Sequence, residues 1–138
     1  MKFIDAITVD TGRGAAEGSL FVDGDADYLR DHFPGAPTLP GLVMLEAAVR
    51  TAAALWEAGA GPTGGSVLTQ VDRLQLVRRV VPGETFLVTA ERLAGPDEAG
   101  TAAFAAQGAV DGETAMRARF RLRAAGATHS NAIEEVAK

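Results

Sequence analysis

Apolar and polar positions alternate in two different ways along this chain, which predicts strands on both sides of one helix. Residues 3–10 and 18–23 alternate loosely and predict two strands joined by a glycine-containing turn. Residues 41–59 place apolar side chains three and four positions apart, which predicts a helix. The opposite side of this helix is also mostly apolar, so we expect it to be buried on several sides.

The second half of the chain predicts strands at residues 67–77, 86–91 and 101–110, separated by turns that contain glycine. An Asp-Gly pair then predicts a hairpin into a final strand. That strand alternates most regularly, because one side is apolar and the other is cationic. The apolar positions are Met116, Ala118, Phe120 and Leu122, and the cationic positions are Arg117, Arg119, Arg121 and Arg123.

This order predicts an α+β fold with one long central helix. About six strands would form a curved antiparallel sheet around it, because an apolar helix in a short chain must be wrapped by the other elements. Such a layout is called a hot-dog fold. We expect a single domain over residues 1–125 and a flexible tail over 126–138, where the periodicity stops.

Composition excludes several classes of protein. The chain has 138 residues, 47% of them hydrophobic and 22% charged, as in a globular domain. It has no cysteine, which excludes disulfide scaffolds, cysteine-based metal centres and thiol catalysis. The net charge of −5 argues against nucleic acid as a partner, and no apolar run is long enough to span a membrane. The amino terminus lacks the apolar core of a signal peptide, so we expect a cytoplasmic protein. We also expect that it binds no metal.

The residues that carry chemistry lie at the start of the predicted helix. His32 stands on a loop rich in proline and glycine, and Glu46 follows fourteen residues later inside the apolar helix. Carboxylates are rarely placed among apolar residues without a partner or a function. The free amides of Gly41 and Leu42, about 7.5 Å along the axis from Glu46, could hold a carbonyl oxygen that gains negative charge. A base, an acid and an oxyanion site are the groups needed to eliminate water from a β-hydroxy carbonyl compound.

The stretch His-Phe-Pro-Gly-Ala-Pro-Thr-Leu-Pro-Gly at residues 32–41, followed by Glu46 and Ala47, resembles the β-hydroxyacyl-acyl-carrier-protein dehydratases of the FabZ/FabA family. All fixed positions of the family motif are matched. The resemblance continues in residues 71–84, whose Val-Val-Pro-Gly-Glu ending is similar to a turn that is common in these enzymes.

The resemblance implies a dehydratase that converts a 3-hydroxyacyl thioester into the trans-2-enoyl thioester. His32 would remove the proton from C2, Glu46 would help to expel the hydroxyl group, and the amide of Gly41 would bind the thioester carbonyl. The substrate would be carried on the phosphopantetheine of an acyl carrier protein, with no other cofactor. The family fold is an obligate homodimer with shared active sites, and some members form trimers of dimers.

One position departs from the family pattern close to the proposed acid. Arg50 stands where the family usually has glutamine, and it lies on the same helix face as Glu46. A guanidinium this close favours the ionised carboxylate and would oppose its role as an acid. Arg50 would therefore tune the reaction or turn toward the mouth of the acyl tunnel, to which Phe33 and Pro40 are also assigned.

The cationic side of the last strand has two interpretations. It can be an ordinary solvated face, or it can attract an acidic carrier protein. The docking candidates are Arg73, Arg78, Arg79, Arg117, Arg119 and Arg121.

Two other functions remain open from the residues alone. One is a non-catalytic acyl-binding hot-dog subunit of a heteromeric dehydratase, against which the intact His32 and Glu46 pair argues. The other is a hot-dog thioesterase, which would activate water at the thioester carbonyl. The biosynthetic setting would be polyketide or fatty-acid synthesis.

Overall fold

A computed structural model describes residues 3–26, 29, 37–60 and 65–125 of the chain. They form six strands and one helix. In chain order these are β1 (Ala6–Asp10), β2 (Ala15–Phe21), α1 (Gly41–Ala60), β3 (Ser66–Leu76), β4 (Thr85–Ala94), β5 (Thr101–Val110) and β6 (Glu113–Ala124).

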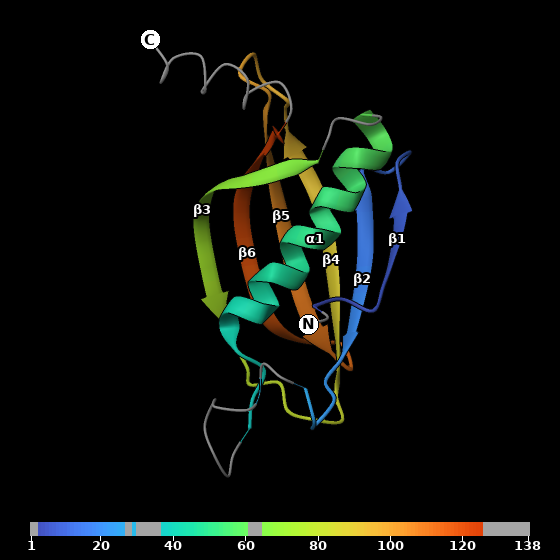
Figure 1. Cartoon of the computed structure of the whole chain (residues 1–138), viewed down its shortest axis with the longest axis vertical. Helices are drawn as coiled ribbons and strands as arrows, with labels where there is room; N and C mark the ends of the chain where they lie inside the picture. The colour runs from blue at the N-terminus through green and yellow to red at the C-terminus, as the bar shows by residue number, and fades with distance from the viewer. Residues whose placement is uncertain (1–2, 27–28, 30–36, 61–64, 126–138) are drawn as a thin grey trace.

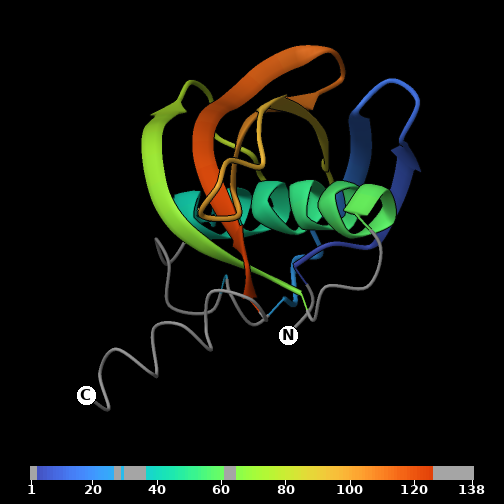
Figure 2. The same cartoon turned by 90° about the horizontal axis from the view of Figure 1, so that it is seen from above.

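The strands form one sheet in the order β1-β2-β4-β5-β6-β3, and each neighbouring pair is antiparallel. The chain crosses from β2 through α1 to β3 at the far edge of the sheet (Figure 1). Seen from above, the strands arch around α1 (Figure 2). The predicted hot-dog arrangement is therefore confirmed.

The inner face of the sheet and one side of α1 make up the core. Phe86, Phe104 and Phe120 are completely buried, and Trp56 of α1 packs 6.1 Å from Phe104 between ring centroids. Burial of each large apolar side chain contributes about 1.5–3 kcal/mol. The predicted alternation of β6 is confirmed, because its apolar positions from Met116 to Leu122 are buried.

The second strand begins earlier than predicted, at Ala15 instead of residue 18, and ends at Phe21. Its inward positions include Ala16, which has a small side chain, and Gly18, which has none. The alternation of apolar and polar residues is therefore hard to see in this part of the sequence. A Cβ atom on Gly18 would lie 2.3 Å from Thr51 Oγ1 of α1. The close approach of β2 to the helix therefore requires a residue without a side chain here.

The prediction that α1 is buried on several sides is wrong for one stripe of the helix. Leu42 is 76% exposed, and the side chains of Glu46 and Arg50 are 41% and 49% exposed. Ala47, Ala48 and Ala52 on the other side are fully buried. The sheet covers only part of the circumference of α1, so this open stripe (Leu42, Glu46 and Arg50) faces outward.

In the described ranges, α1 does not combine the length and apolarity needed to cross a bilayer. The expected tail at 126–138 lies outside the described residues.

Candidate functional site

The start of α1 is held in place by the loop that follows β3. The amide of Leu39 donates a hydrogen bond to the Val80 carbonyl at 2.7 Å, and the Pro40 carbonyl accepts hydrogen bonds from Val43 and Met44 at 3.0 and 3.1 Å. Proline fixes its own φ angle and thereby presets the entry to the helix. The helix begins at Gly41, as predicted from the glycine and proline signals.

The first two amides of the helix keep their hydrogen-bonding capacity. In the described part of the chain, neither Gly41 nor Leu42 donates a backbone hydrogen bond, as expected for the first turn of a helix. Leu76 at the end of β3 lies directly over Gly41, where a Cβ atom would come within 2.6 Å of Leu76 Cδ1. The glycine therefore lets the edge strand approach the start of α1.

A cavity of about 400 Å³ opens beside Gly41, the first residue of the helix. Gly41 and Met44 contribute from α1, and Leu76 and Arg79 contribute from the end of β3 and the loop after it. The remaining lining residues are Thr38, Leu39, Val77 and Arg78. The cavity thus combines apolar walls with amide and guanidinium groups, which suits a thioester with an apolar chain.

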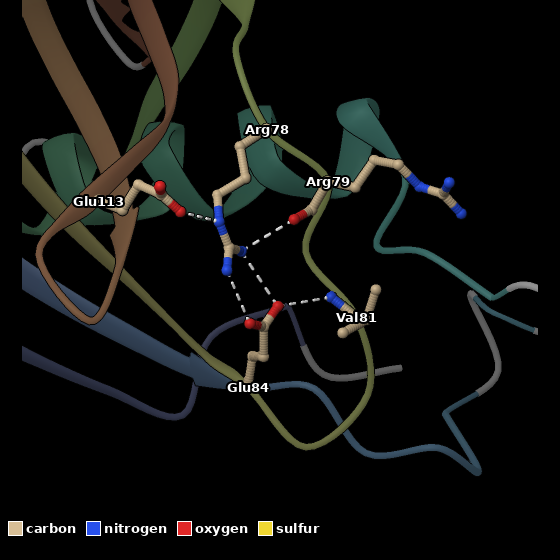
Figure 3. A network of polar contacts seen from close by, with 5 residues as sticks. All are labelled: Arg78, Arg79, Val81, Glu84 and Glu113. Carbon is tan, nitrogen blue, oxygen red and sulfur yellow. Dashed lines mark hydrogen bonds and ion pairs between the residues drawn. The ribbon is translucent and has the colours of Figure 1, made fainter.

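A network of polar contacts braces the loop after β3 (Figure 3). Arg78 donates two hydrogen bonds to Glu84, at 2.9 and 3.1 Å, and another to Glu113 of β6. It also donates to the Arg79 carbonyl, while the Val81 amide donates to Glu84 at 2.9 Å. These contacts fix the loop that supports Leu39 and lines the cavity.

The network shifts both of its central groups toward their charged forms. Hydrogen bonds from Arg78, and then from the Val81 amide, lower the pKa of Glu84 below its ordinary value of 4.5. The hydrogen bonds that Arg78 donates to Glu84 and Glu113 raise the pKa of Arg78 above its ordinary range. The sequence marked Glu84 only as part of a turn, because no local pattern shows that Arg78 folds back onto it. Glu113 of β6, which also binds Arg78, is distant in the chain.

Glu46 is held differently on the open stripe. Its Oε1 accepts one hydrogen bond from Arg50 Nε at 2.9 Å. Its second oxygen has no hydrogen-bond donor among the residues that the structure describes. The Arg50 guanidinium lies 4.9 Å from the ring centroid of Phe3, a cation–π contact that holds it in place. The sequence did not single out Phe3, which is far from α1 along the chain.

The structure therefore places Glu46, Arg50, Gly41, Leu42 and Pro40 on one element or at its start. His32 and Phe33 lie outside the described residues. In the described ranges, no three histidine, aspartate or glutamate side chains gather as metal ligands do.

The six arginines assigned to docking fall into three groups. Arg78 belongs to the braced loop, and Arg79 is exposed at the cavity, with its side chain pointing away from the network (Figure 3). The others lie on the outer face of the sheet, away from α1; these are Arg73, Arg117, Arg119 and Arg121.

Comparisons with known proteins identify a family of dehydratases. A family model described as "ApeI-like: ApeI dehydratase" matches residues 8–119. A 3-hydroxyacyl-[acyl-carrier-protein] dehydratase FabZ from Acetivibrio thermocellus is 33% identical over 119 residues, covering 84% of this chain and 78% of that protein.

Solved structures share the fold at lower identity. One is the dehydratase heterocomplex ApeI:P from Xenorhabdus doucetiae, with a TM-score of 0.63 and 20% identity over 87% of this chain and 96% of that one. Another, described as a putative thioesterase from Ralstonia eutropha, has a TM-score of 0.69 and 16% identity, covering 87% of this chain and 82% of that one. These likenesses establish the hot-dog fold.

Proposed function

Since this chain belongs to the ApeI-like dehydratases, hydro-lyases with a hot-dog fold, we propose that it dehydrates a 3-hydroxyacyl thioester carried by an acyl carrier protein. The products are the trans-2-enoyl thioester and water. The observation that carries this proposal is the exposed carboxylate of Glu46, one oxygen of which accepts no hydrogen bond from the described residues, on a mostly apolar helix. The free amides at the start of that helix lie next to the cavity.

The elimination needs one proton removed and one supplied. His32 takes the proton from C2, since an imidazole has a pKa suited to this role near neutral pH. The C2 electron pair forms the double bond while the C3–oxygen bond breaks. Glu46 in its protonated form gives its proton to the departing hydroxyl, which leaves as water. Arg50 must release or share the Glu46 carboxyl for this step.

The amides of Gly41 and Leu42 supply the third group. Removal of the C2 proton moves negative charge onto the thioester oxygen. Free amides at the positive end of a helix stabilise such a charge without reorganising. The cavity at this helix end has the apolar lining that an acyl chain requires.

The open stripe and the edge strand β3 support a homodimer with shared sites. Leu68, Val71 and Leu74 on β3 are between 38% and 39% exposed, and Leu76 is 54% exposed. Exposed apolar side chains on an unpaired strand edge favour pairing with another chain. In such a dimer β3 would meet its counterpart and cover the stripe, so that His32 of one copy would face Glu46 of the other.

Arg79 is the docking candidate best placed for the carrier protein. It is exposed where the cavity opens, so a carrier bound there could insert its phosphopantetheine arm directly. An Arg79→Glu variant should raise KM for a carrier-bound substrate and leave a pantetheine thioester substrate unaffected. Arg13→Glu, in the turn between β1 and β2, is the matched control. An equal loss with both substrates would contradict docking at Arg79.

The remaining parts of the proposal follow from the reaction. It needs no metal or nucleotide, since the thioester itself acidifies C2. The enzyme would work in the cytoplasm, in polyketide or fatty-acid synthesis. Assembly beyond the dimer would not change the chemistry.

The decisive test is mass spectrometry of a short 3-hydroxyacyl carrier protein after incubation with the enzyme. Wild type should remove one water, whereas His32→Ala and Glu46→Gln should not. Release of free carrier thiol would indicate a thioesterase instead. Tight carrier binding without loss of water, at several chain lengths, would indicate a non-catalytic subunit of a heteromeric dehydratase.

A further inference from the structure

The outer face of the sheet carries opposite charges on either side of its middle strand. Glu91 of β4 is paired with Ala105 of β5, and Ala105 is paired with Arg119 of β6. The neighbours Ala90, Ala106 and Ala118 are buried toward α1, so these three residues point outward. A negative, a small and a positive residue therefore stand in one row across the sheet.

This row crosses a hollow of about 580 Å³ on the outer face. Ala15 and Ala105 contribute small side chains to its floor. Arg73, Arg117 and Arg119 lie on one side of it and Glu91 on the other. In the described residues, neither Arg119 nor Glu91 has an ion-pair partner. Arg121 differs from them, because Asp72 binds its Nε at 3.1 Å. Arg119 and Glu91 thus line the hollow without an ion-pair partner from the part of the chain that the structure describes.

The same face exposes apolar surface beside these charges. Leu87 and Leu93 on β4 are 42% and 46% exposed, although they belong to a strand in the interior of the sheet. Exposed apolar side chains of this kind are typical of a surface that contacts another protein, because that contact buries them. A small ion would not bury them.

The row formed by Glu91, Ala105 and Arg119 is complementary in charge to the same row of a second copy. Consider a two-fold axis that runs along β5, parallel to the strands and just outside the sheet. Rotation about it places β6 of a second copy over β4 of the first, and each residue keeps its height along the strand. Glu91 then lies opposite Arg119 of the second copy, and Arg119 lies opposite Glu91 of the second copy. One contact surface forms two ion pairs, as expected for a two-fold interface.

We propose that the outer face of the sheet packs against the same face of a second copy, with Glu91 and Arg119 forming reciprocal ion pairs about Ala105. Packed sheets lie about 10 Å apart, a gap that glutamate and arginine can span together. The usual rotation of about 30° between packed sheets shifts residues one strand from the axis by only roughly 2–3 Å. The arch of the sheet over α1 leaves this face open to approach (Figure 2).

A second copy gives both Glu91 and Arg119 an opposite charge, whereas an acidic carrier protein would not. An acidic partner would be attracted by Arg73, Arg117 and Arg119 but repelled by Glu91 in the same hollow. The surface also lies on the opposite side of the sheet from α1, and so from the cavity at the start of that helix. Together with the proposed pairing of two copies through β3, this packing would produce a tetramer. The packing does not depend on whether the proposed reaction is correct.

The test is the mass in solution, measured by size-exclusion chromatography with light scattering. Glu91→Lys and Arg119→Glu should each weaken the association, by roughly 10–100-fold, and halve the mass at low micromolar concentration. The combined variant E91R/R119E should restore it, because the reversed charges still face each other. Glu98→Lys, in the turn before β5, changes the net charge equally and should leave the mass unchanged.

Several outcomes would overturn this proposal. An unchanged mass for Glu91→Lys would mean that the face is not an interface between copies. Failure of E91R/R119E to restore the mass, with a normal circular dichroism spectrum, would mean that the two residues do not meet. If Arg119→Glu impairs turnover of a carrier-bound substrate alone and leaves the mass unchanged, the face contacts the carrier instead. Arg119→Gln with Glu91→Gln provides milder variants should the reversals fail to fold.

Discussion

Two arginine–glutamate pairs in this molecule have the same chemistry but different surroundings. In the loop after β3, Glu84 accepts two hydrogen bonds from Arg78 and one from the Val81 amide, and its side chain is 22% exposed. On the open stripe of α1, Glu46 accepts a single hydrogen bond from Arg50 and is 41% exposed.

The difference separates a structural role from a chemical one. The hydrogen bonds that Glu84 accepts from Arg78 and the Val81 amide stabilise its charged form, so the pKa of Glu84 is lowered and its position in the loop is fixed. Within the described ranges, one oxygen of Glu46 is left for another ligand, and the exposed ion pair with Arg50 is worth little. A carboxyl that must exchange a proton with a substrate needs the second arrangement.

The largest expected effect is on turnover at the open pair. Glu46→Gln should lower kcat by about 10²–10⁴-fold, because the amide cannot supply a proton. The melting temperature should stay near that of wild type, since the lost ion pair is exposed. Glu57→Gln, an exposed glutamate farther along α1, is the matched control. If Glu46→Gln lost stability but kept its turnover, Glu46 would have the structural role that is assigned here to Glu84.

The braced pair should show the opposite result. Glu84→Gln should destabilise the fold by about 1 kcal/mol, because Arg78 loses its charged acceptor and the loop loses a brace. Chemical denaturation followed by circular dichroism would measure this. Turnover should fall much less than in Glu46→Gln. A destabilisation no larger than that of Glu57→Gln would mean that the network is not structural.

The contribution of Glu84 should depend on pH. Its pKa is lowered in the folded state, so its stabilisation is complete above the unfolded pKa near 4.5 and is lost as pH falls through the folded value. The difference in stability between wild type and Glu84→Gln should therefore shrink as the pH is lowered from 6 toward 3. A difference that stays constant over this range would rule out the ionised pair as its cause.

The smallest effect is expected at Arg50. Arg50→Gln should raise kcat by roughly 2–5-fold, because the exposed ion pair must release the Glu46 carboxyl before it can act on the substrate. Phe3→Ala should act in the same direction but more weakly, since it removes only the cation–π support. Identical pH–rate profiles for wild type and Arg50→Gln would show that the pair does not tune the reaction.

Local patterns predicted most of the fold and the site residues that lie on α1. They did not predict the contact of Phe3 with Arg50 or the network around Glu84. The start of α1 at Gly41 and the alternation of β6 follow from residues adjacent in the chain, and both are confirmed. The catalytic roles of His32 and Glu46 come from a motif and stay predictions until the variants are measured. The early start of β2 was missed because Gly18 contributes no apolar side chain, although it packs on the helix.

By itself, the sequence determined which segments are strands, which is the helix, and which side chains can carry out chemistry, because these depend on local spacing and residue type. Only the tertiary structure decided that Glu46 stays open while Glu84 is braced by Arg78, which Glu113 of β6 holds in place. The row of Glu91, Ala105 and Arg119 likewise exists only through strand register. The physical reason is that partners distant in the chain are chosen by packing of the whole sheet, which no local pattern encodes.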